Sequence, residues 1–301
     1  MLLALALSAY ILMALSDDLQ FEYIPSLKDV QTELFGGGSP ADENNSCEVH
    51  FIDVGQGDSA IILSDGKSIL IDGGENDKGD IVVDYLKRLG VGRIDLLIAT
   101  HPHSDHIGGL DTVINELSIG KILMPRLPEE QTPATRTYTE LLTAIADKGL
   151  RITPAKAGNV YEFGEGRLEV LGPLADYEDL NNTSLVCKFT YAGKSFLFTG
   201  DMEEPTEKDM LRSGTDVKAD VLKAGHHGSK TSTSKDFYQA VNPSVCIVSA
   251  GEGNSYGHPN KETLETFRSN GAKVYRTDYQ GSITVGIAEG KLTVSCEKDG
   301  G

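Results

Sequence analysis

The sequence predicts an α/β fold in which two β-sheets pack face to face and helices cover their outer surfaces. Short apolar segments bounded by glycine-containing turns alternate with segments of helical periodicity, and this succession occurs twice along the chain. The 33 glycines, compared with 9 Phe and 11 Tyr, favour short strands and tight turns over a helical bundle. One domain of roughly 250 residues lies within the size that sandwich-type domains reach.

The first half of this domain is expected to begin with a meander of strands. Residues 49–74 contain three apolar segments joined by glycine turns, which predicts three short strands. Helical spacing with a terminal glycine predicts helices over 81–90 and 137–149. The remaining elements of this half are strands over 93–100 and 121–125 and a helix over 110–117.

The second half is expected to contain more strands than the first. Apolar segments between glycine turns predict them at 167–173, 184–201, 219–225, 244–250, 273–277, 282–287 and 291–296. Helical spacing predicts the helices between them at 204–214, 235–241 and 261–271.

The first 16 residues, MLLALALSAYILMALS, form the only strongly apolar run of the sequence. A run this short suits a secretory signal or an anchor better than a full membrane span, although a positively charged start is missing. We therefore expect 1–16 to be a signal-like or anchor segment of an extracytoplasmic protein, secreted or membrane-tethered. The alternative is an internal strand or helix packed on the domain. Residues 17–46 have the composition of a flexible linker, which leaves 47–298 as the folded domain.

The net charge of −18 comes from 27 basic and 45 acidic residues. Such a surface repels nucleic acid at long range and argues against a general DNA-binding face. A local basic patch or bound metal cations can override this repulsion at a cleft.

The four cysteines are widely spaced and contain no CxxC, which argues against a structural zinc ribbon. Cys187 and Cys246 stand in apolar runs and are expected to be buried thiols. Cys47 and Cys296 flank the domain, so a disulfide between them would tie its ends in an oxidising compartment. The sequence does not select among the three pairings.

Three histidines and an aspartate occur within six residues, in the run Thr100-His101-Pro102-His103-Ser104-Asp105-His106. Three neighbouring imidazoles would repel one another when protonated and would be costly to desolvate. Metal ions remove both problems, because neutral imidazole and carboxylate are good ligands. In an irregular loop, His101 and His103 can reach one ion while Asp105 and His106 reach its neighbour.

Two further groups complete such a site. Asp201 ends the apolar strand FLFTGD, where its two oxygens can bridge two cations; alternatively it caps the helix that follows. His226 and His227 follow the strand VLKAG and can supply the missing ligand.

The motifs IDGG (with Asp72), THPHSDHIGG, FTGD and GHHGS, in this order, resemble the metallo-β-lactamase superfamily. The runs FIDVGQGDSAII, NNTSLV, LKAGHHGS and SYGHP resemble more specifically the hydrolase domain of ComEC-type DNA-uptake proteins. The resemblance covers about residues 48–296. It implies an α/β (α+β) fold, the four-layer αββα sandwich, with a two-metal cleft at one edge of the sheets.

The resemblance also implies roles for single residues. His101 and His103 match ligands of the first metal, Asp105 and His106 those of the second, Asp201 the bridging carboxylate, and either His226 or His227 the last ligand. We assign His226 to the metals, and Asp105, Asp201 and His227 to catalysis. Asp72 would support the histidine loop instead of binding metal.

One departure from the family concerns the first metal. Superfamily hydrolases usually provide a third histidine from a loop before the bridging aspartate, where this sequence has Asn181-Asn182-Thr183-Ser184. The site is therefore expected to be open or completed by Asn, His258 or substrate. Fewer nitrogen ligands make two divalent ions of either Zn²⁺ or Mn²⁺ plausible.

Four residues are predicted to support the ligands or to contact the substrate: Asn182, Ser184, Lys223 and His258. Lys223, like Lys230, would add positive potential for a phosphate; the alternative is a solvated lysine. His258 lines the cleft or is an ordinary turn residue.

Two metals about 3.5–4 Å apart activate a water for attack on phosphorus or a carbonyl carbon. By resemblance the sequence predicts a metal-dependent phosphodiesterase, most of all a DNA nuclease. Alternatives are a cell-surface phosphoester hydrolase of the phosphorylcholine esterase type, a β-lactamase, and a non-catalytic subunit of a DNA-uptake apparatus. The expected partners are a phosphoester substrate, DNA among them, and a membrane through residues 1–16; no partner protein is evident.

Overall fold

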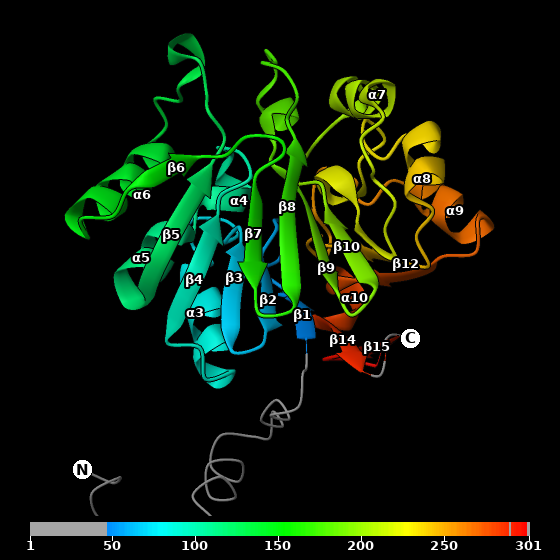
Figure 1. Ribbon diagram of the computed structural model, residues 1–301, viewed down its shortest axis with the longest axis horizontal. Helices are drawn as coiled ribbons and strands as arrows, with labels where there is room; N and C mark the ends of the chain where they lie inside the picture. Colours follow the sequence, from blue (N-terminus) through cyan, green and yellow to red (C-terminus); the bar gives the residue numbers. More distant parts are fainter. Residues whose placement is uncertain (1–46, 289, 300–301) are drawn as a thin grey trace, which may run out of the picture. The chain divides into compact units, whose positions relative to one another are not determined.

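The computed structural model describes residues 47–288 and 290–299. These residues form two sheets packed face to face, with helices on both outer faces (Figure 1). The predicted four-layer α/β sandwich is confirmed. The predictions for 1–16 and 17–46 lie outside the described residues.

The first sheet has eight strands in the order β15-β14-β1-β2-β3-β4-β5-β6. Strands β1 to β3 form the antiparallel meander expected from the glycine turns, and β3 to β6 run parallel. The bounds are β1 (Cys47–Phe51), β2 (Ala60–Ser64), β3 (Lys67–Ile71), β4 (Arg93–Ile98), β5 (Ser118–Met124), β6 (Ile152–Pro154), β14 (Ile283–Ala288) and β15 (Lys291–Cys296).

The second sheet has seven strands in the order β13-β12-β11-β10-β9-β8-β7. Strands β7 to β10 are antiparallel, and β10 to β13 are parallel. The bounds are β7 (Val160–Phe163), β8 (Gly166–Gly172), β9 (Val186–Tyr191), β10 (Lys194–Phe198), β11 (Val221–Lys223), β12 (Val245–Val248) and β13 (Lys273–Arg276).

Three apolar clusters hold the layers together. The inner one joins the two sheets and contains Phe51, Phe189, Phe196 and Phe198. Central strands such as β4 alternate between this cluster and an outer one: Leu96 and Ile98 face inward, and Leu97 faces outward. Because both faces are covered, the strands appear in the sequence as continuous apolar runs.

Helices bury the outer faces of the sheets. The first sheet is covered by α3 (Gly79–Arg88), α5 (Leu110–Glu116) and α6 (Arg136–Asp147). The second is covered by α7 (Glu204–Ser213), α8 (Lys235–Val241) and α9 (Lys261–Ser269). The remaining helical segments are short: α4 (Ser104–Ile107), α10 (Thr277–Gln280), η1 (Glu129–Gln131), η2 (Leu180–Thr183) and η3 (Gly225–Gly228).

The disulfide between Cys47 and Cys296, which the sequence left open, does not form in this structure. Cys47 lies opposite Ile287 of β14, whereas Cys296 lies opposite Ile283 of the same strand. Four residues of extended strand separate these positions by about 13 Å. A disulfide needs Cα atoms within about 7 Å, and all four cysteines are free thiols. Cys187 and Cys246 are buried, as predicted.

Among the described residues, no helix combines the length and the apolar character that crossing a bilayer requires.

Candidate metal centre

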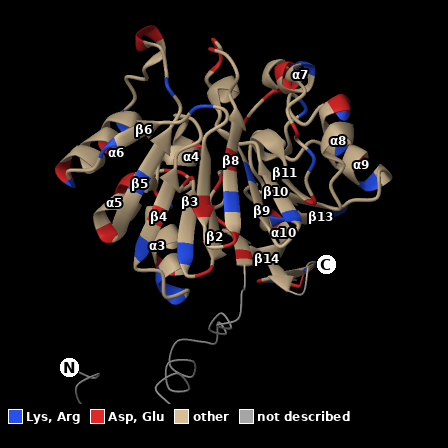
Figure 2. Ribbon diagram, in the orientation of Figure 1, with Lys and Arg blue, Asp and Glu red and all other residues tan. Residues whose placement is uncertain are grey.

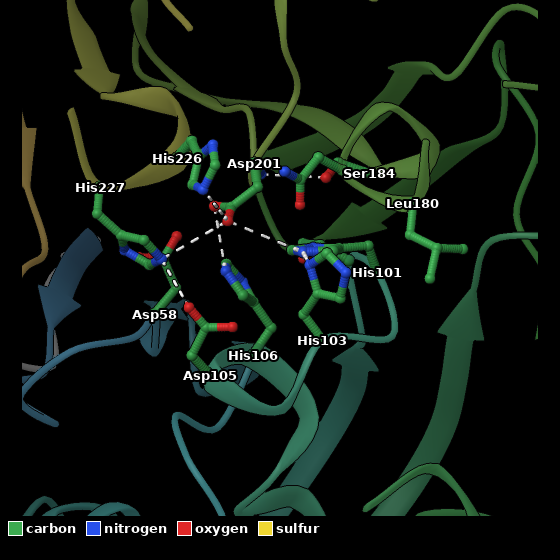
Figure 3. Close-up of polar contacts among 12 residues, drawn as sticks. Asp58, His101, His103, Asp105, His106, Leu180, Ser184, Asp201, His226 and His227 are labelled. Atoms are coloured by element: carbon green, nitrogen blue, oxygen red, sulfur yellow. Dashed lines mark hydrogen bonds and ion pairs between the residues drawn. The ribbon is translucent and has the colours of Figure 1, made fainter. Parts of the chain in front are cut away.

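The site residues come from loops at the carboxyl ends of strands. His101 to His106 follow β4, Asp201 follows β10, and His226 and His227 follow β11. Each of these three strands has a parallel neighbour in its sheet. The carboxyl ends of parallel strands meet at one edge of a sheet, which is where ligands usually bind. Figure 3 shows the side chains from both sheets converging there.

Four side chains place one potential ligand atom each within 4.8 Å of one another: Asp105, His106, Asp201 and His227. Nε2 of His227 lies 3.1 Å from Oδ2 of Asp105 and 3.6 Å from Oδ2 of Asp201. His106, Asp201 and His227 are buried, and the Asp105 side chain is 23% exposed. Two imidazoles and two carboxylates at one edge of a cleft form a set that suits a divalent transition metal.

One pair in this group has the geometry of two ligands and not of a hydrogen bond. Nε2 of His106 and Oδ1 of Asp201 lie 3.1 Å apart, yet both are buried atoms without a hydrogen-bond partner. Buried polar atoms are nearly always satisfied. A cation that accepts lone pairs from both atoms resolves this, so the donors present fit a metal ion.

His101 and His103 lie beside this group. Nε2 of His101 is 3.1 Å from Nδ1 of His103 and 3.9 Å from Oδ2 of Asp201. Two imidazole nitrogens therefore point to one place, with the second oxygen of Asp201 next to them (Figure 3). This arrangement suits a first metal that shares Asp201 with the second.

Asp72 lies behind the histidine loop, as the resemblance implied. Its carboxylate accepts hydrogen bonds from the Thr100 amide at 2.8 Å and the Thr100 hydroxyl at 2.7 Å. Oδ2 of Asp72 also lies 2.8 Å from Nδ1 of His106. A carboxylate on one ring nitrogen fixes the tautomer and leaves the other nitrogen free to bind metal.

The histidine loop is more regular than predicted. Residues Ser104–Ile107 form the helical turn α4, for which His103 in extended conformation is the N-cap. This turn brings Asp105 and His106 to one side, while His101 and His103 remain in the extended segment before it.

Of the two neighbouring histidines, the structure places His227 and not His226 among the clustered ligand atoms. His227 belongs to the group of four, whereas His226 does not. Both adopt left-handed backbone angles, with φ of 47° and 53°, and their rings lie 6.0 Å apart between centroids with planes at 69°. The ring of His227 is buried, with Nδ1 3.1 Å from the Ser249 carbonyl oxygen. The His226 side chain is 24% exposed, and its Nδ1 faces Oε1 of Glu203 at 3.2 Å.

Lys223 does not contact the cleft, contrary to the prediction that it meets a phosphate. It is buried, and its Nζ lies 2.8 Å from Oδ2 of Asp58. The other oxygen of Asp58 lies 3.2 Å from Nδ1 of His227. Lys223 therefore neutralises a carboxylate that supports the metal-facing histidine. Asp58 is a residue that the sequence analysis missed.

Asn182 and Ser184 brace the loop that carries Asp201. The Ser184 hydroxyl accepts a hydrogen bond from the Asp201 amide at 3.0 Å. Oδ1 of Asn182 accepts from the Thr206 hydroxyl at 2.9 Å and the Glu203 amide at 3.2 Å. Neither residue lines the cleft, but their neighbour Asn181 does, and its buried Oδ1 has no hydrogen-bond partner.

The electrostatics of the centre depend on its four buried or partly buried carboxylates: Asp58, Asp72, Asp105 and Asp201. Burial opposes ionisation of Asp58, but Lys223 and then His227 lower its pKa to about 2. Burial likewise opposes ionisation of Asp201, but His106 and His227 hold its pKa well below the usual value. Only one lysine, Lys223, pairs with these four acids in the described residues. Buried negative charge in excess of buried positive charge favours cations.

A cleft of about 440 Å³ opens onto the metal-facing residues. Its walls contain His103, Asp105, Asp201, His226 and His227. His258 also lines it, which decides between the two alternatives given for this residue, a cleft residue or an ordinary turn residue. The His258 ring lies 5.3 Å from the His226 ring, between ring centroids, so this residue sits at the His226 end of the cleft. None of the fifteen described residues that line the cleft is Lys or Arg.

Comparison with known proteins identifies the family. Residues 52–251 match the model of the metallo-beta-lactamase superfamily. The chain is 32% identical over 259 residues to ComE operon protein 3 of Bacillus subtilis, covering 78% of this chain and 32% of that protein. It is 30% identical over 253 residues to recombination protein 2 of Haemophilus influenzae, covering 82% of this chain and 30% of that protein. The chain thus spans about a third of the length of these relatives.

Solved structures agree with the fold. Igni18, described as a novel metallo hydrolase of Ignicoccus hospitalis, has a TM-score of 0.53 at 16% identity, covering 79% of this chain and 98% of that one. Competence protein ComA of Neisseria gonorrhoeae is a further sequence relative, at 29% identity over 82% of this chain and 33% of that protein. Taken with the ligand geometry, these matches show that the chain belongs to the metallo-beta-lactamase superfamily, as a domain of the ComEC type.

Proposed function

We propose that this domain is a metal-dependent phosphodiesterase that acts on DNA. The observation that carries the proposal is the unsatisfied buried pair His106 Nε2 and Asp201 Oδ1, in which Asp201 also lines the cleft among further ligands. Relatives named for competence and recombination support nucleic acid as the substrate. The acidic composition of the chain requires that cations in the cleft meet the phosphate charge.

The proposed ligands fall into two sets that share Asp201. His101 and His103 would hold the first ion, and Asp105, His106 and His227 the second. When bound, a pair of divalent cations supplies Lewis acidity to a phosphoryl oxygen and lowers the pKa of the attacking water.

Asn181 is proposed to complete the first set. It stands in the segment where superfamily hydrolases usually have a histidine, it lines the same cleft as His103, and its buried Oδ1 has no hydrogen-bond partner. An amide oxygen is a harder ligand than imidazole, so this substitution favours Mn²⁺ relative to Zn²⁺.

His226 is proposed to handle the proton of the leaving group. Glu203 faces its Nδ1, and the Thr231 hydroxyl donates a 2.6 Å hydrogen bond to the same carboxylate oxygen. The ring is thereby held with Nε2 near Asp201, at 3.7 Å from Oδ2, inside the cleft. From that position a protonated Nε2 can donate to the departing oxygen, which is the role of a general acid.

The test is a substrate panel with added Mn²⁺ or Zn²⁺: single-stranded and plasmid DNA, bis(p-nitrophenyl) phosphate, p-nitrophenyl phosphorylcholine and a chromogenic cephalosporin. We expect cleavage of the DNA and the diester, and loss of both in Asp201→Ala. Asp216→Ala is the matched control, because the Asp216 side chain is 80% exposed, forms its ion pair with Lys188 and does not line the cleft. If the wild type cleaves neither diester with either metal, the proposal is wrong.

A further inference from the structure

Tyr256 stands out as an exposed aromatic ring at the rim of the cleft. It is 69% exposed, the largest value among the large apolar residues that the structure describes. Tyr279 is similarly exposed at 62%, but the Arg276 guanidinium lies over its ring at 4.0 Å. Tyr256 lines the cleft together with His258, so its ring faces the space that a substrate would enter.

A series of near-parallel rings connects Tyr256 to the proposed ligands. The Tyr256 and His258 rings have centroids 5.9 Å apart and planes 24° apart. The His258 and His227 rings follow at 6.5 Å and 28°. These spacings lie in the range of offset-stacked aromatic pairs. The Tyr256 ring is therefore separated from His227 by the His258 ring, and neighbouring planes in the series differ by less than 30°.

The loop that carries Tyr256 is held firmly by Asn254. Its Nδ2 donates to the Gly251 carbonyl at 2.9 Å and to the His258 carbonyl, and its Oδ1 accepts from the His258 amide at 3.1 Å. The Gly251 amide donates in turn to Oε1 of Gln56 on the β1–β2 loop. Because the backbone on both sides of Tyr256 is fixed by such contacts, binding of a flat partner costs little conformational entropy of the loop.

The remainder of the cleft lining, as far as the structure describes it, contains no Lys or Arg side chain. Its lining contains amides and hydroxyls from Gln56, Asn76, Ser104, Thr135 and Thr137, and carboxylates from Glu75 and Asp105. Because the phosphate charge is left to the metal ions, additional affinity must come from stacking and neutral hydrogen bonds. A flat, uncharged nucleobase fits that requirement better than a second phosphate.

Two acidic loops precede cleft residues in the chain and disfavour a duplex. Glu129 and Glu130 precede the cleft residue Thr135, and the acidic segment 176–179 precedes Asn181; both loops appear in red at the top of Figure 2. Nε2 of Gln131 donates to the Tyr177 carbonyl at 2.9 Å and joins the two loops. The two phosphate backbones of a duplex would be repelled there, and its paired bases offer no free face.

We propose that Tyr256 is the stacking platform for the base of the nucleotide next to the scissile phosphate, so that the cleft takes unpaired DNA ends and single strands. This inference rests on the proposed phosphodiesterase function and names its substrate class. Stacking of one base on an aromatic side chain corresponds to a change in affinity of roughly 5- to 150-fold.

The experiment compares two chromogenic diesters that differ only in the base. These are the p-nitrophenyl ester of thymidine 5′-monophosphate and the p-nitrophenyl ester of abasic deoxyribose 5-phosphate. For the wild type we expect the base-bearing ester to have the higher kcat/KM. Tyr256→Ala should lower kcat/KM for that ester roughly 5- to 150-fold, mainly through KM, and leave the abasic ester within about twofold. Tyr256→Phe should restore the preference, and Tyr279→Ala is the matched control for loss of an exposed tyrosine.

A second measurement uses binding instead of turnover. Fluorescence anisotropy of labelled dT10 and of an abasic decamer is recorded with the cleavage-deficient Asp201→Ala chain and its Tyr256→Ala double variant. Weaker binding of dT10 alone in the double variant supports the platform. An equal loss for both oligomers overturns it, as does an effect of Tyr256→Ala confined to p-nitrophenyl phosphorylcholine, which would indicate a cationic head group.

The two proposals fail in different ways. Cleavage of both esters without a base preference overturns the stacking platform and leaves the phosphodiesterase intact. Cleavage of neither ester, with tighter binding of dT10 than of the abasic decamer, overturns the phosphodiesterase and leaves the platform intact.

Discussion

Oδ2 of Asp72 lies 2.8 Å from Nδ1 of His106, and the other nitrogen of the same ring lies 3.1 Å from Oδ1 of Asp201. Asp72 is buried and also receives two hydrogen bonds from Thr100, so its carboxylate has little freedom to move. The orientation of the His106 ring is therefore set by a residue that does not itself face the cleft.

Asp72→Asn should weaken metal binding without removing a ligand. An amide can donate to Nδ1 of His106 and so favours the wrong tautomer, which would place a hydrogen on Nε2. Loss of such a supporting carboxylate usually costs about 10–100-fold in metal affinity. The measurement is competition with a chromogenic chelator for Zn²⁺ and Mn²⁺.

Asp220→Asn is the matched control for Asp72→Asn. Asp220 is also a partly buried carboxylate that accepts hydrogen bonds from a backbone amide and a hydroxyl, those of Ser195. It precedes β11, at the opposite end of that strand from His226 and His227. Its replacement should leave metal affinity unchanged. Equal losses in the two variants would contradict the role given to Asp72.

Replacing one partner of the Asp58–Lys223 ion pair should destabilise the fold more than replacing both. Both side chains are buried, at 8% and 4% exposure, so Lys223→Met leaves a buried carboxylate without its cation. Breaking such a pair typically costs about 3–5 kcal/mol. The double variant Asp58→Asn with Lys223→Met should recover part of this loss. Urea unfolding of the wild type, both single variants and the double variant measures the coupling; strictly additive effects would contradict it.

Asn181→His should shift the metal preference towards Zn²⁺. A histidine there would restore the nitrogen ligand that this sequence lacks, and imidazole suits zinc better than an amide oxygen does. The measurement is the Zn to Mn ratio, by elemental analysis, after loading with an equimolar mixture of the two ions. Asn115→His on the exposed side of α5 controls for adding a histidine anywhere. An unchanged ratio in Asn181→His would place Asn181 outside the first metal set.

The layers of the fold and the histidine loop could both be predicted because each produces a local pattern in the sequence. Buried strands and amphipathic helices have local periodicity, and His101 to His106 form a dense local cluster. Strands β6 and β7 were missed. Strand β6 is only three residues long and ends in Pro154, so it has no visible alternation. Residues 160–163, of strand β7, lie at the sheet edge and have only Phe163 buried.

Contacts between the two sheets could not be predicted in this way. Asp58 follows β1 of the first sheet, and its partner Lys223 ends β11 of the second. The glycines around Asp58 gave a signal only for a turn, and Lys223 in isolation resembled a surface lysine. Similarly, which of His226 and His227 joins the ligand group depends on two consecutive left-handed residues, and the dipeptide His-His does not predict that conformation.

His226→Asn and His227→Asn should therefore separate metal binding from catalysis. His227 belongs to the ligand group, so its replacement should reduce bound metal at the second site along with activity. His226 is held by Glu203 at the cleft and is not a member of that group, so its replacement should leave metal content unchanged. Loss of a general acid lowers kcat by roughly 10²–10⁴-fold. The readouts are metal content by elemental analysis and turnover of DNA and bis(p-nitrophenyl) phosphate. A comparison of two leaving groups gives a further test. The p-nitrophenolate that leaves the p-nitrophenyl diester is a weak base and needs less protonation than the sugar oxygen that leaves DNA. His226→Asn should thus impair DNA cleavage more than cleavage of the p-nitrophenyl diester, and metal loss in this variant would reverse the assignment.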